Sequence, residues 1–220
     1  VFLRLDYVEA GEGQWALFRT ADHGGAPIPE MARRSGVIAG RGPIRLWVKS
    51  SIESALRQKY GLPTEGKVYV ERVSENAVYL NLAAIADHAV EALDIAAAAA
   101  TRVNAVMAAY PTNDLRSDHD HANPLRRALA YGLCHQRTGD IQCILEPYWI
   151  DGTSPATHGS PHSYDREVIG MAIGPGIQKG VTLAAPITPG FGAVLLAKML
   201  HIPKPSAAHE HVPAGFFGMR

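Results

Sequence analysis

The chain has 220 residues, of which 47% are hydrophobic and 19% are charged, so it is long enough to bury a substantial core as a globular protein. Its 21 basic and 21 acidic residues give a formal net charge of zero. That balance favours neither nucleic acid nor an anionic membrane as a partner, and no run of residues reaches the roughly 20 apolar positions of a membrane-spanning helix. We therefore expect no nucleic-acid or membrane partner.

The first elements predicted along the chain are two strands and a helix. Residues 14–20 form an apolar run that predicts a buried strand, and the glycines and prolines of residues 24–29 end it in a loop. Residues 44–49 are predicted to form a second strand. A short amphipathic helix is predicted over residues 52–60, ended by Gly61.

The middle of the chain predicts a hairpin and a long helix. Residues 67–73 and 77–82 are predicted to pair as strands around a hairpin-type connection at residues 74–76. Asp94 is a favourable N-cap for a helix over residues 95–110, whose five consecutive alanines have high helix propensity.

The last third of the chain predicts a helix, two strands and a final helix. A proline opens the short helix predicted over residues 124–133. Strands are predicted over residues 141–150 and 168–173, and a helix over residues 191–200. This alternation of strands and helices indicates the α/β class. We predict a core formed by residues 1–42 and 124–220, with residues 43–123 as a small inserted α/β subdomain.

Two loops place metal-ligand residue types beside glycines. Asp22 and His23 follow the first predicted strand in Thr-Ala-Asp-His-Gly-Gly, and His158 follows a later strand in Thr-His-Gly-Ser-Pro. Carboxylate oxygens and imidazole nitrogens are ligands of zinc and similar divalent ions. Because ligands of open α/β sheets bind where loops converge at the carboxyl ends of strands, Asp22, His23 and His158 are predicted metal ligands.

The residues alone leave several arrangements open for the Asp-His doublet. A sharp turn at Gly24 and Gly25 would bring both side chains to one cation, and a wider turn would send them to two neighbouring ions. Alternatively, Asp22 forms an Asx turn and His23 is a surface residue.

The longer motifs around these residues resemble the alkaline phosphatase superfamily. Residues 20–30, Thr-Ala-Asp-His-Gly-Gly-Ala-Pro-Ile-Pro-Glu, resemble the second metal motif of that superfamily, and residues 157–165, Thr-His-Gly-Ser-Pro-His-Ser-Tyr-Asp, resemble a later one. The resemblance is to the alkaline phosphatases with a threonine nucleophile and to the type I phosphodiesterase/nucleotide pyrophosphatases. It continues, in the family's order, through residues 78–81, 137–140, 146–149 and 174–177.

The resemblance implies part of an alkaline-phosphatase-like sheet with flanking helices, and a site with two zinc ions. It assigns Asp22 and His23 to the ion that holds the nucleophile, and His158 to the other ion. Ligand imidazoles must be neutral, so metal affinity should fall as the pH drops through the histidine range.

The sequence also departs from the family pattern. The family's nucleophilic threonine or serine, an aspartate ligand and a further Asp and His lie upstream of the Asp-His motif, and residues 1–19 do not contain that pattern. We therefore expect a C-terminal portion with half of the ligand set, from a processed or truncated product that begins at Val1. After Tyr-Asp the family usually continues as Thr-His-Val-Pro, whereas this chain has Arg166 and Glu167 followed by Val-Ile.

The sequence supports one leading hypothesis and two alternatives. The leading one is the C-terminal portion of a zinc-dependent phosphatase or phosphodiesterase acting on a small phosphoester, and the resemblance implies a periplasmic or secreted parent. The first alternative is a non-catalytic module that self-associates as a homo-oligomer. The second is a hydrolase of other esters that uses a remnant metal site.

The remaining cysteines and histidines carry weaker signals. Cys134 and Cys143 are either two ordinary thiols or a disulfide, because pairing needs Cα atoms within about 7 Å. Residues 118–121, Asp-His-Asp-His, are expected to form a solvated connection, and the tail residues 209–211 could catch adventitious metal. A role for His162 in supporting the metal ligands is speculative.

Overall fold

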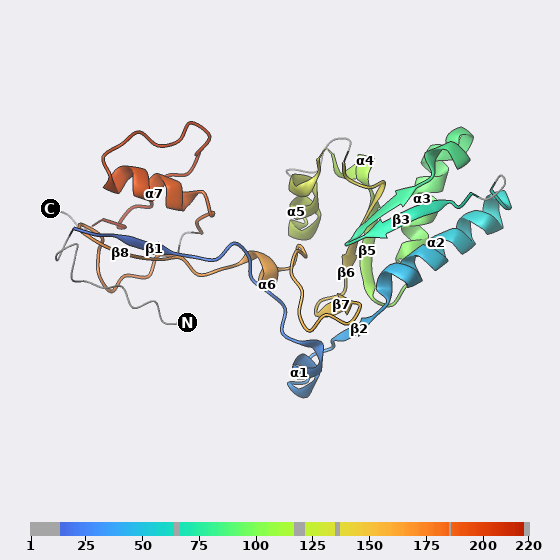
Figure 1. Ribbon diagram of the computed structural model, residues 1–220, viewed down its shortest axis with the longest axis horizontal. Coiled ribbons are helices and arrows are strands. Elements are labelled where there is room, and N and C mark those ends of the chain that lie inside the picture. Colours follow the sequence, from blue (N-terminus) through green and yellow to red (C-terminus); the bar gives the residue numbers. More distant parts are fainter. Residues whose placement is uncertain (1–13, 64–66, 117–121, 135–136, 185, 218–220) are drawn as a thin grey trace. The chain divides into compact units, whose positions relative to one another are not determined.

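The computed structural model describes residues 14–63, 67–116, 122–134, 137–184 and 186–217 (Figure 1). The chain divides into two compact units, of which the first joins Val1–His23 to Glu167–Arg220 and the second is Gly24–Arg166. The boundaries of these units differ from the domain division predicted at residues 42 and 123, which stays a prediction.

The second unit is built on a four-stranded antiparallel sheet in the order β3-β4-β6-β5. Its strands are β3 (Val70–Ser74), β4 (Ala77–Leu80), β5 (Val106–Pro111) and β6 (Ile141–Leu145). The predicted hairpin is confirmed by the pairing of β3 with β4, and Glu75 adopts a φ of 52° in its turn.

One face of this sheet is covered by α2 (Ile44–Tyr60) and α3 (Ala89–Ala100) (Figure 1). The strand predicted over residues 44–49 is wrong, because those residues are the first turns of α2. Buried apolar residues recur every four positions along this helix and form a continuous stripe against the core. They are Ile44, Val48, Ile52 and Leu56.

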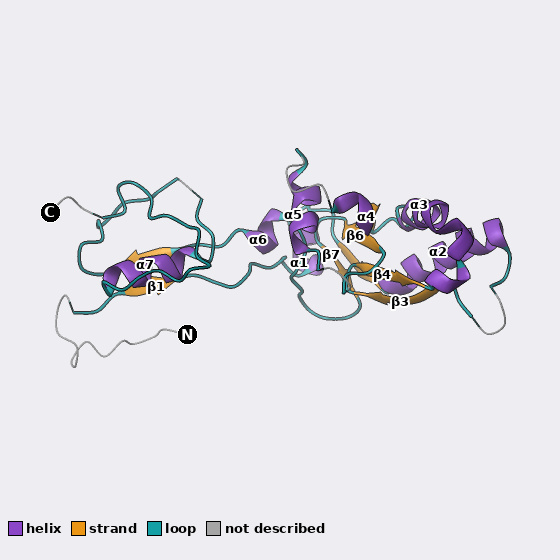
Figure 2. Ribbon diagram, turned by 90° about the horizontal axis from the view of Figure 1, so that it is seen from above, coloured by secondary structure: helices purple, strands orange, loops and turns teal. Residues whose placement is uncertain are grey.

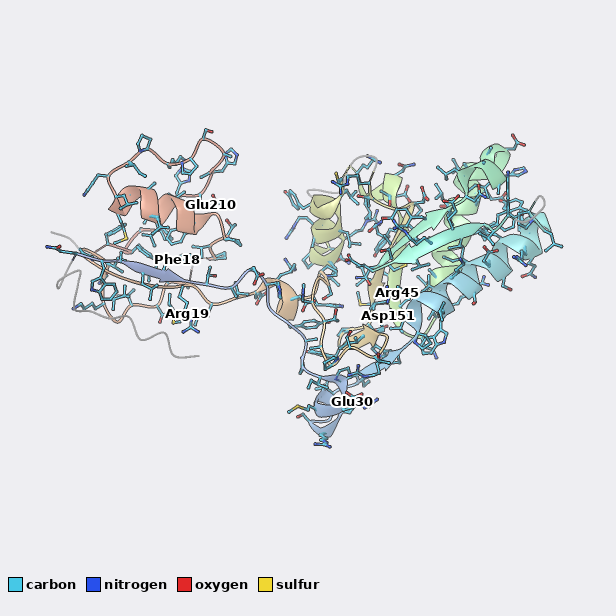
Figure 3. All side chains as sticks on the ribbon, in the orientation of Figure 1. Phe18, Arg19, Glu30, Arg45, Asp151 and Glu210 are labelled. Atoms are coloured by element: carbon cyan, nitrogen blue, oxygen red, sulfur yellow. The ribbon has the colours of Figure 1, made fainter. Side chains whose placement is uncertain are left out.

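The N-terminus of α2 is capped from a distant strand. Pro43 stands at the N-cap position and gives no side-chain hydrogen bond. Instead, the carboxylate of Asp151 accepts a hydrogen bond of 2.8 Å from the backbone N–H of Arg45 and pairs with the Arg45 guanidinium (Figure 3). A negative charge there also complements the helix dipole, so the cap holds α2 to β7 (Trp149–Asp151).

The helix predicted over residues 95–110 is also wrong in its bounds. Helix α3 begins at Ala89, with His88 at its N-cap, and it ends at Ala100. Five of its alanines are buried, which lets it pack closely against α2. The chain then turns and continues as β5, because residues 106–111 pair with β6. Tertiary pairing overrides the local helix propensity in this segment.

The opposite face of the sheet is approached by α5 (Pro124–Gly132), which confirms the helix predicted at this position. Asn123 caps α5 by accepting a hydrogen bond of 2.9 Å from the N–H of Leu125. The guanidinium of Arg126 lies over the ring of Tyr110 on β5, 4.7 Å from its centroid. The short helix α4 (Thr112–Leu115) joins this side of the unit.

Short elements complete the second unit. Strand β2 (Gly40–Gly42) pairs in parallel with β7. The strand predicted over residues 141–150 is divided into β6 and β7 by Tyr148, whose φ is 63°. The remaining elements are α1 (Pro29–Arg34), β2 (Gly40–Gly42), η1 (Leu82–Ala84), η2 (Ala86–His88) and α6 (Ser163–Arg166).

In its described residues, the first unit contains a two-stranded ribbon and one helix (Figure 2). Its elements are β1 (Leu17–Arg19), antiparallel β8 (Met171–Ile173) and α7 (Phe191–Met199). The ring of Phe18 meets that of Phe191 edge to face at 5.6 Å, which packs the ribbon against the helix (Figure 3). Residues 14–20 were expected to be a buried strand, but β1 is shorter and Leu17 is 37% exposed.

The predicted α/β class is confirmed, since both units mix strands with flanking helices. In the described ranges no helix is both long and apolar enough to cross a bilayer.

The two cysteines are thiols in very different surroundings. Cys143 on β6 is 3% exposed, and burial raises its pKa to about 12 because the thiolate would lie in an apolar core. Cys134 is exposed, and no disulfide joins the two residues.

We expect a thiol reagent such as Ellman's reagent to label one cysteine of the folded chain and the second only after unfolding, because the thiolate is the reactive form. Cys134→Ser should abolish the labelling of the folded chain. Two fast reactions per folded chain would contradict the burial of Cys143.

Candidate functional site

The Asp-His doublet lies three residues after β1 in the first unit. The Oδ2 atom of Asp22 is 3.6 Å from the Nε2 atom of His23, and the two side chains are 89% and 39% exposed. An exposed pair of this kind contributes little to stability. Both donor groups are therefore accessible to an ion from solvent.

His158 lies in the loop that follows β7 in the second unit and is exposed. Two glycines with positive φ flank this loop, Gly152 at 78° and Gly159 at 94°. Because the doublet belongs to one unit and His158 to the other, their joint binding of metal stays a prediction. Over the part of the chain that the structure describes, no three His, Cys, Asp or Glu residues form a metal-binding group.

Within the second unit, the backbone that directly follows the doublet is held against the later motif. The N–H of Gly24 donates to the carbonyl of Asp165 at 2.8 Å, and the N–H of Gly25 donates to the carbonyl of Tyr164 at 2.9 Å. A Cβ atom on Gly24 would stand 2.0 Å from the Tyr164 carbonyl oxygen, whereas one on Gly25 would meet only the Thr157 carbonyl oxygen, at 3.9 Å. The close approach therefore requires glycine at position 24. We call these two hydrogen bonds the glycine clamp.

Asp165 is a further functional candidate that was not among the predicted metal ligands. It is 5% exposed, and its Oδ2 atom accepts a hydrogen bond of 2.8 Å from the N–H of Ser160, two residues after His158. Its Oδ1 atom is buried and has no hydrogen-bond partner in the described residues. Buried carboxylate oxygens are nearly always paired, so this atom is an acceptor available to a ligand or a side chain of the site. The sequence signal was the Tyr-Asp that ends the later motif.

A second connection joins α1 to the loop before His158. The Nε and Nη2 atoms of Arg41 donate to the carboxylate of Glu30 at 2.8 and 2.9 Å, and its Nη1 atom donates to the carbonyl of Ser154. The hydrogen bond from Arg41 lowers the pKa of Glu30 to about 2. Because the pKa of Glu30 is lowered in the folded state, its ionised carboxylate stabilises the fold at pH values above the ordinary carboxyl range. This contribution is lost as the pH falls toward 2.

The other histidine candidates have different outcomes. His162 is 7% exposed, its Nε2 atom lies 2.9 Å from the carbonyl oxygen of Leu145, and its ring stacks on Tyr164 at 5.2 Å. These contacts give His162 a structural role in joining α6 to β6. Residues 118–121 lie outside the described residues.

Known proteins share the fold of this chain. No family model matches the chain. A protein named calcium-transporting ATPase from Myroides odoratus is 29% identical over 177 residues, which are 78% of this chain and 31% of that protein. Crystal structures of the wild-type alkaline phosphatase PafA and of a mutant of it both match with a TM-score of 0.75 and 22% identity, over 94% of this chain and 39% of theirs.

The fold is that of part of an alkaline phosphatase. This confirms, at the level of the fold, the resemblance that the two metal motifs indicated. The chain spans about a third of the curated relative and about two fifths of the solved structures.

The glycine clamp makes a direct test possible. Gly24→Ala should destabilise the chain by about 2 kcal/mol or more, because the added Cβ overlaps a backbone oxygen and breaks two hydrogen bonds. Gly25→Ala is the matched control and should have a much smaller effect, since its Cβ finds ordinary contact distances. Chemical denaturation of both variants measures the difference, and equal stabilities would contradict the clamp.

Proposed function

We propose that this chain supplies Asp22, His23 and His158 to the two-zinc centre of a phosphoric ester hydrolase. The observation that carries the proposal is the glycine clamp, which fixes Gly24 and Gly25 to the end of the Thr-His-Gly motif. The donor types fit zinc, since one carboxylate and two imidazoles are ordinary ligands of that ion.

The names of the matched proteins support the same chemistry. One is called an alkaline phosphatase and the other an ATPase, and both activities transfer a phosphoryl group to water. In a two-zinc site the ions stabilise the attacking and the leaving oxygens of an in-line displacement. In this proposal the chain binds these ions through Asp22 as an ionised carboxylate and through His23 and His158 as neutral imidazoles.

The proposal extends to the whole protein. Since this chain spans 39% of the alkaline phosphatase structures that it matches, we propose that the nucleophile and the remaining ligands come from residues outside these 220. We propose a periplasmic or secreted location on the same ground. The isolated chain should then hydrolyse phosphate esters poorly, because the group that accepts the phosphoryl group would come from outside these residues.

Zinc binding tests the ligand assignment independently of catalysis. Equilibrium dialysis with zinc should show binding that weakens at least tenfold in His158→Ala and in Asp22→Asn, because each variant removes a donor. His209→Ala is the control, since the exposed tail could hold adventitious zinc. Loss of zinc in the control together with full retention in His158→Ala would refute the assignment.

A second candidate function is self-association, and it rests on the ribbon of the first unit. Strands β1 and β8 pair with each other and, within the described residues, with no further strand. Met171 and Ile173 on β8 are 46% and 48% exposed. Two-stranded ribbons with apolar side chains readily pair with additional strands. We propose that a second copy of the chain, or other residues of the parent protein, covers this ribbon.

Light scattering separates these states. We expect the isolated chain to form a dimer or larger species at high concentration, and Ile173→Lys to shift it toward monomer by adding charge to the apolar strand. Lys204→Glu, an exposed change in the tail, is the control. A monomeric wild-type chain at high concentration would count against self-association.

A further inference from the structure

A cavity of about 520 Å³ lies in the second unit, on the face of the sheet that α5 approaches. Tyr79 and Gln142 line it from the sheet, and Leu129 and Gly132 line it from α5. Its third wall is the loop after His158, which contributes Gly159 and the next two residues. The volume is in the range of small-molecule sites, roughly 300–1,000 Å³. The cavity therefore adjoins the motif that carries a predicted zinc ligand.

The sheet side of the cavity offers a hydrogen-bond acceptor that the fold does not use. Gln142 is 9% exposed, and its Nε2 atom donates to the carbonyls of Gly139 and Ile141 at 3.3 and 3.2 Å. Its Oε1 atom accepts no hydrogen bond from the described residues. A nearly buried amide oxygen of this kind favours a ligand that brings a donor.

The rim of the cavity carries two opposite charges. Glu75, in the turn between β3 and β4, provides a carboxylate that accepts hydrogen bonds. Arg166 donates through its Nε atom to the carbonyl of Pro161 at 2.6 Å, which holds the guanidinium at the cavity wall.

We propose that the cavity binds the hydroxyl-rich alcohol portion of the phosphoester, of the size of a sugar. This inference rests on the proposed function, because it places the leaving group beside the loop of His158. The Gln142 amide oxygen and the Glu75 carboxylate accept hydrogen bonds from hydroxyl groups, and the Arg166 guanidinium donates to hydroxyl oxygens. The Leu129 side chain packs against the C–H face of the ring.

The test fills the cavity without disturbing its walls. No heavy atom lies within 4 Å of a Cβ built on Gly132, so Gly132→Trp places an indole in open space at the end of α5. Val90→Trp is the matched control, because Val90 lies on a helix of the same unit, is 77% exposed and is remote from the cavity lining. Circular dichroism confirms that both variants fold.

The probes are glucose, glucose 6-phosphate and inorganic phosphate, each titrated into the full 220-residue chain with zinc and followed by saturation-transfer NMR. We expect both sugars to bind, with affinities at least tenfold weaker in Gly132→Trp and unchanged in Val90→Trp. Arg166→Gln and Glu75→Gln should each weaken glucose binding severalfold by removing a charged partner.

The outcomes separate this inference from the proposed function. Equal sugar binding in wild type and Gly132→Trp, or no sugar binding by a wild-type chain that still binds phosphate with zinc, overturns the cavity assignment and leaves the metal site standing. Glucose binding that Gly132→Trp removes, in a chain that binds no zinc, supports the cavity and counts against the assignment of the zinc ligands.

Discussion

Two backbone hydrogen bonds, from Gly24 to Asp165 and from Gly25 to Tyr164, are the constraint on which the candidate site depends. They join segments that lie far apart in the sequence, one before and one after the four-stranded sheet. The approach is so close that the Tyr164 carbonyl occupies the space of a Cβ on Gly24. A side chain at that position would separate the two segments. The backbone that follows His23 would then lose its contact with the backbone of the motif that contains His158.

The same segments are held by groups that do not belong to the predicted metal set. Asp165 fixes the N–H of Ser160, and Arg41 connects Glu30 of α1 to the carbonyl of Ser154. These contacts bracket the loop of His158 on both sides. A loop that carries a ligand on its exposed surface needs such anchors, because an ion binds well only to donors whose positions are already restricted. The anchors restrict the backbone on both sides of the exposed His158.

Local signals predicted some elements well and misjudged others for physical reasons. Helix α5 was predictable because a proline opens it and Asn123 caps it, both within its own sequence. Helix α2 was mistaken for a strand at its start because its cap, Asp151, comes from a distant strand, and the four-residue spacing of Ile44, Val48 and Ile52 that is typical of a buried helix face was missed. Strand β5 was mistaken for helix because its stability comes from pairing with β6. Likewise, residue types indicated the candidate ligands. The close contact of Gly24, and the buried Asp165 oxygen that is unpaired among the described residues, could be recognised only in the folded structure.

The loop of residues 157–161 has contacts on two sides, and it joins the predicted metal ligand to the lining of the cavity. At one end, the Thr157 carbonyl lies near Gly25 in the glycine clamp. At the other end, the backbone turns at Gly159, whose φ is 94°, and lines the cavity together with Pro161. A Cβ on Gly159 would meet open space, so glycine is needed there for its conformation and not for room. His158 lies between these two ends, so one loop carries both the proposed zinc ligand and part of the lining of the proposed cavity.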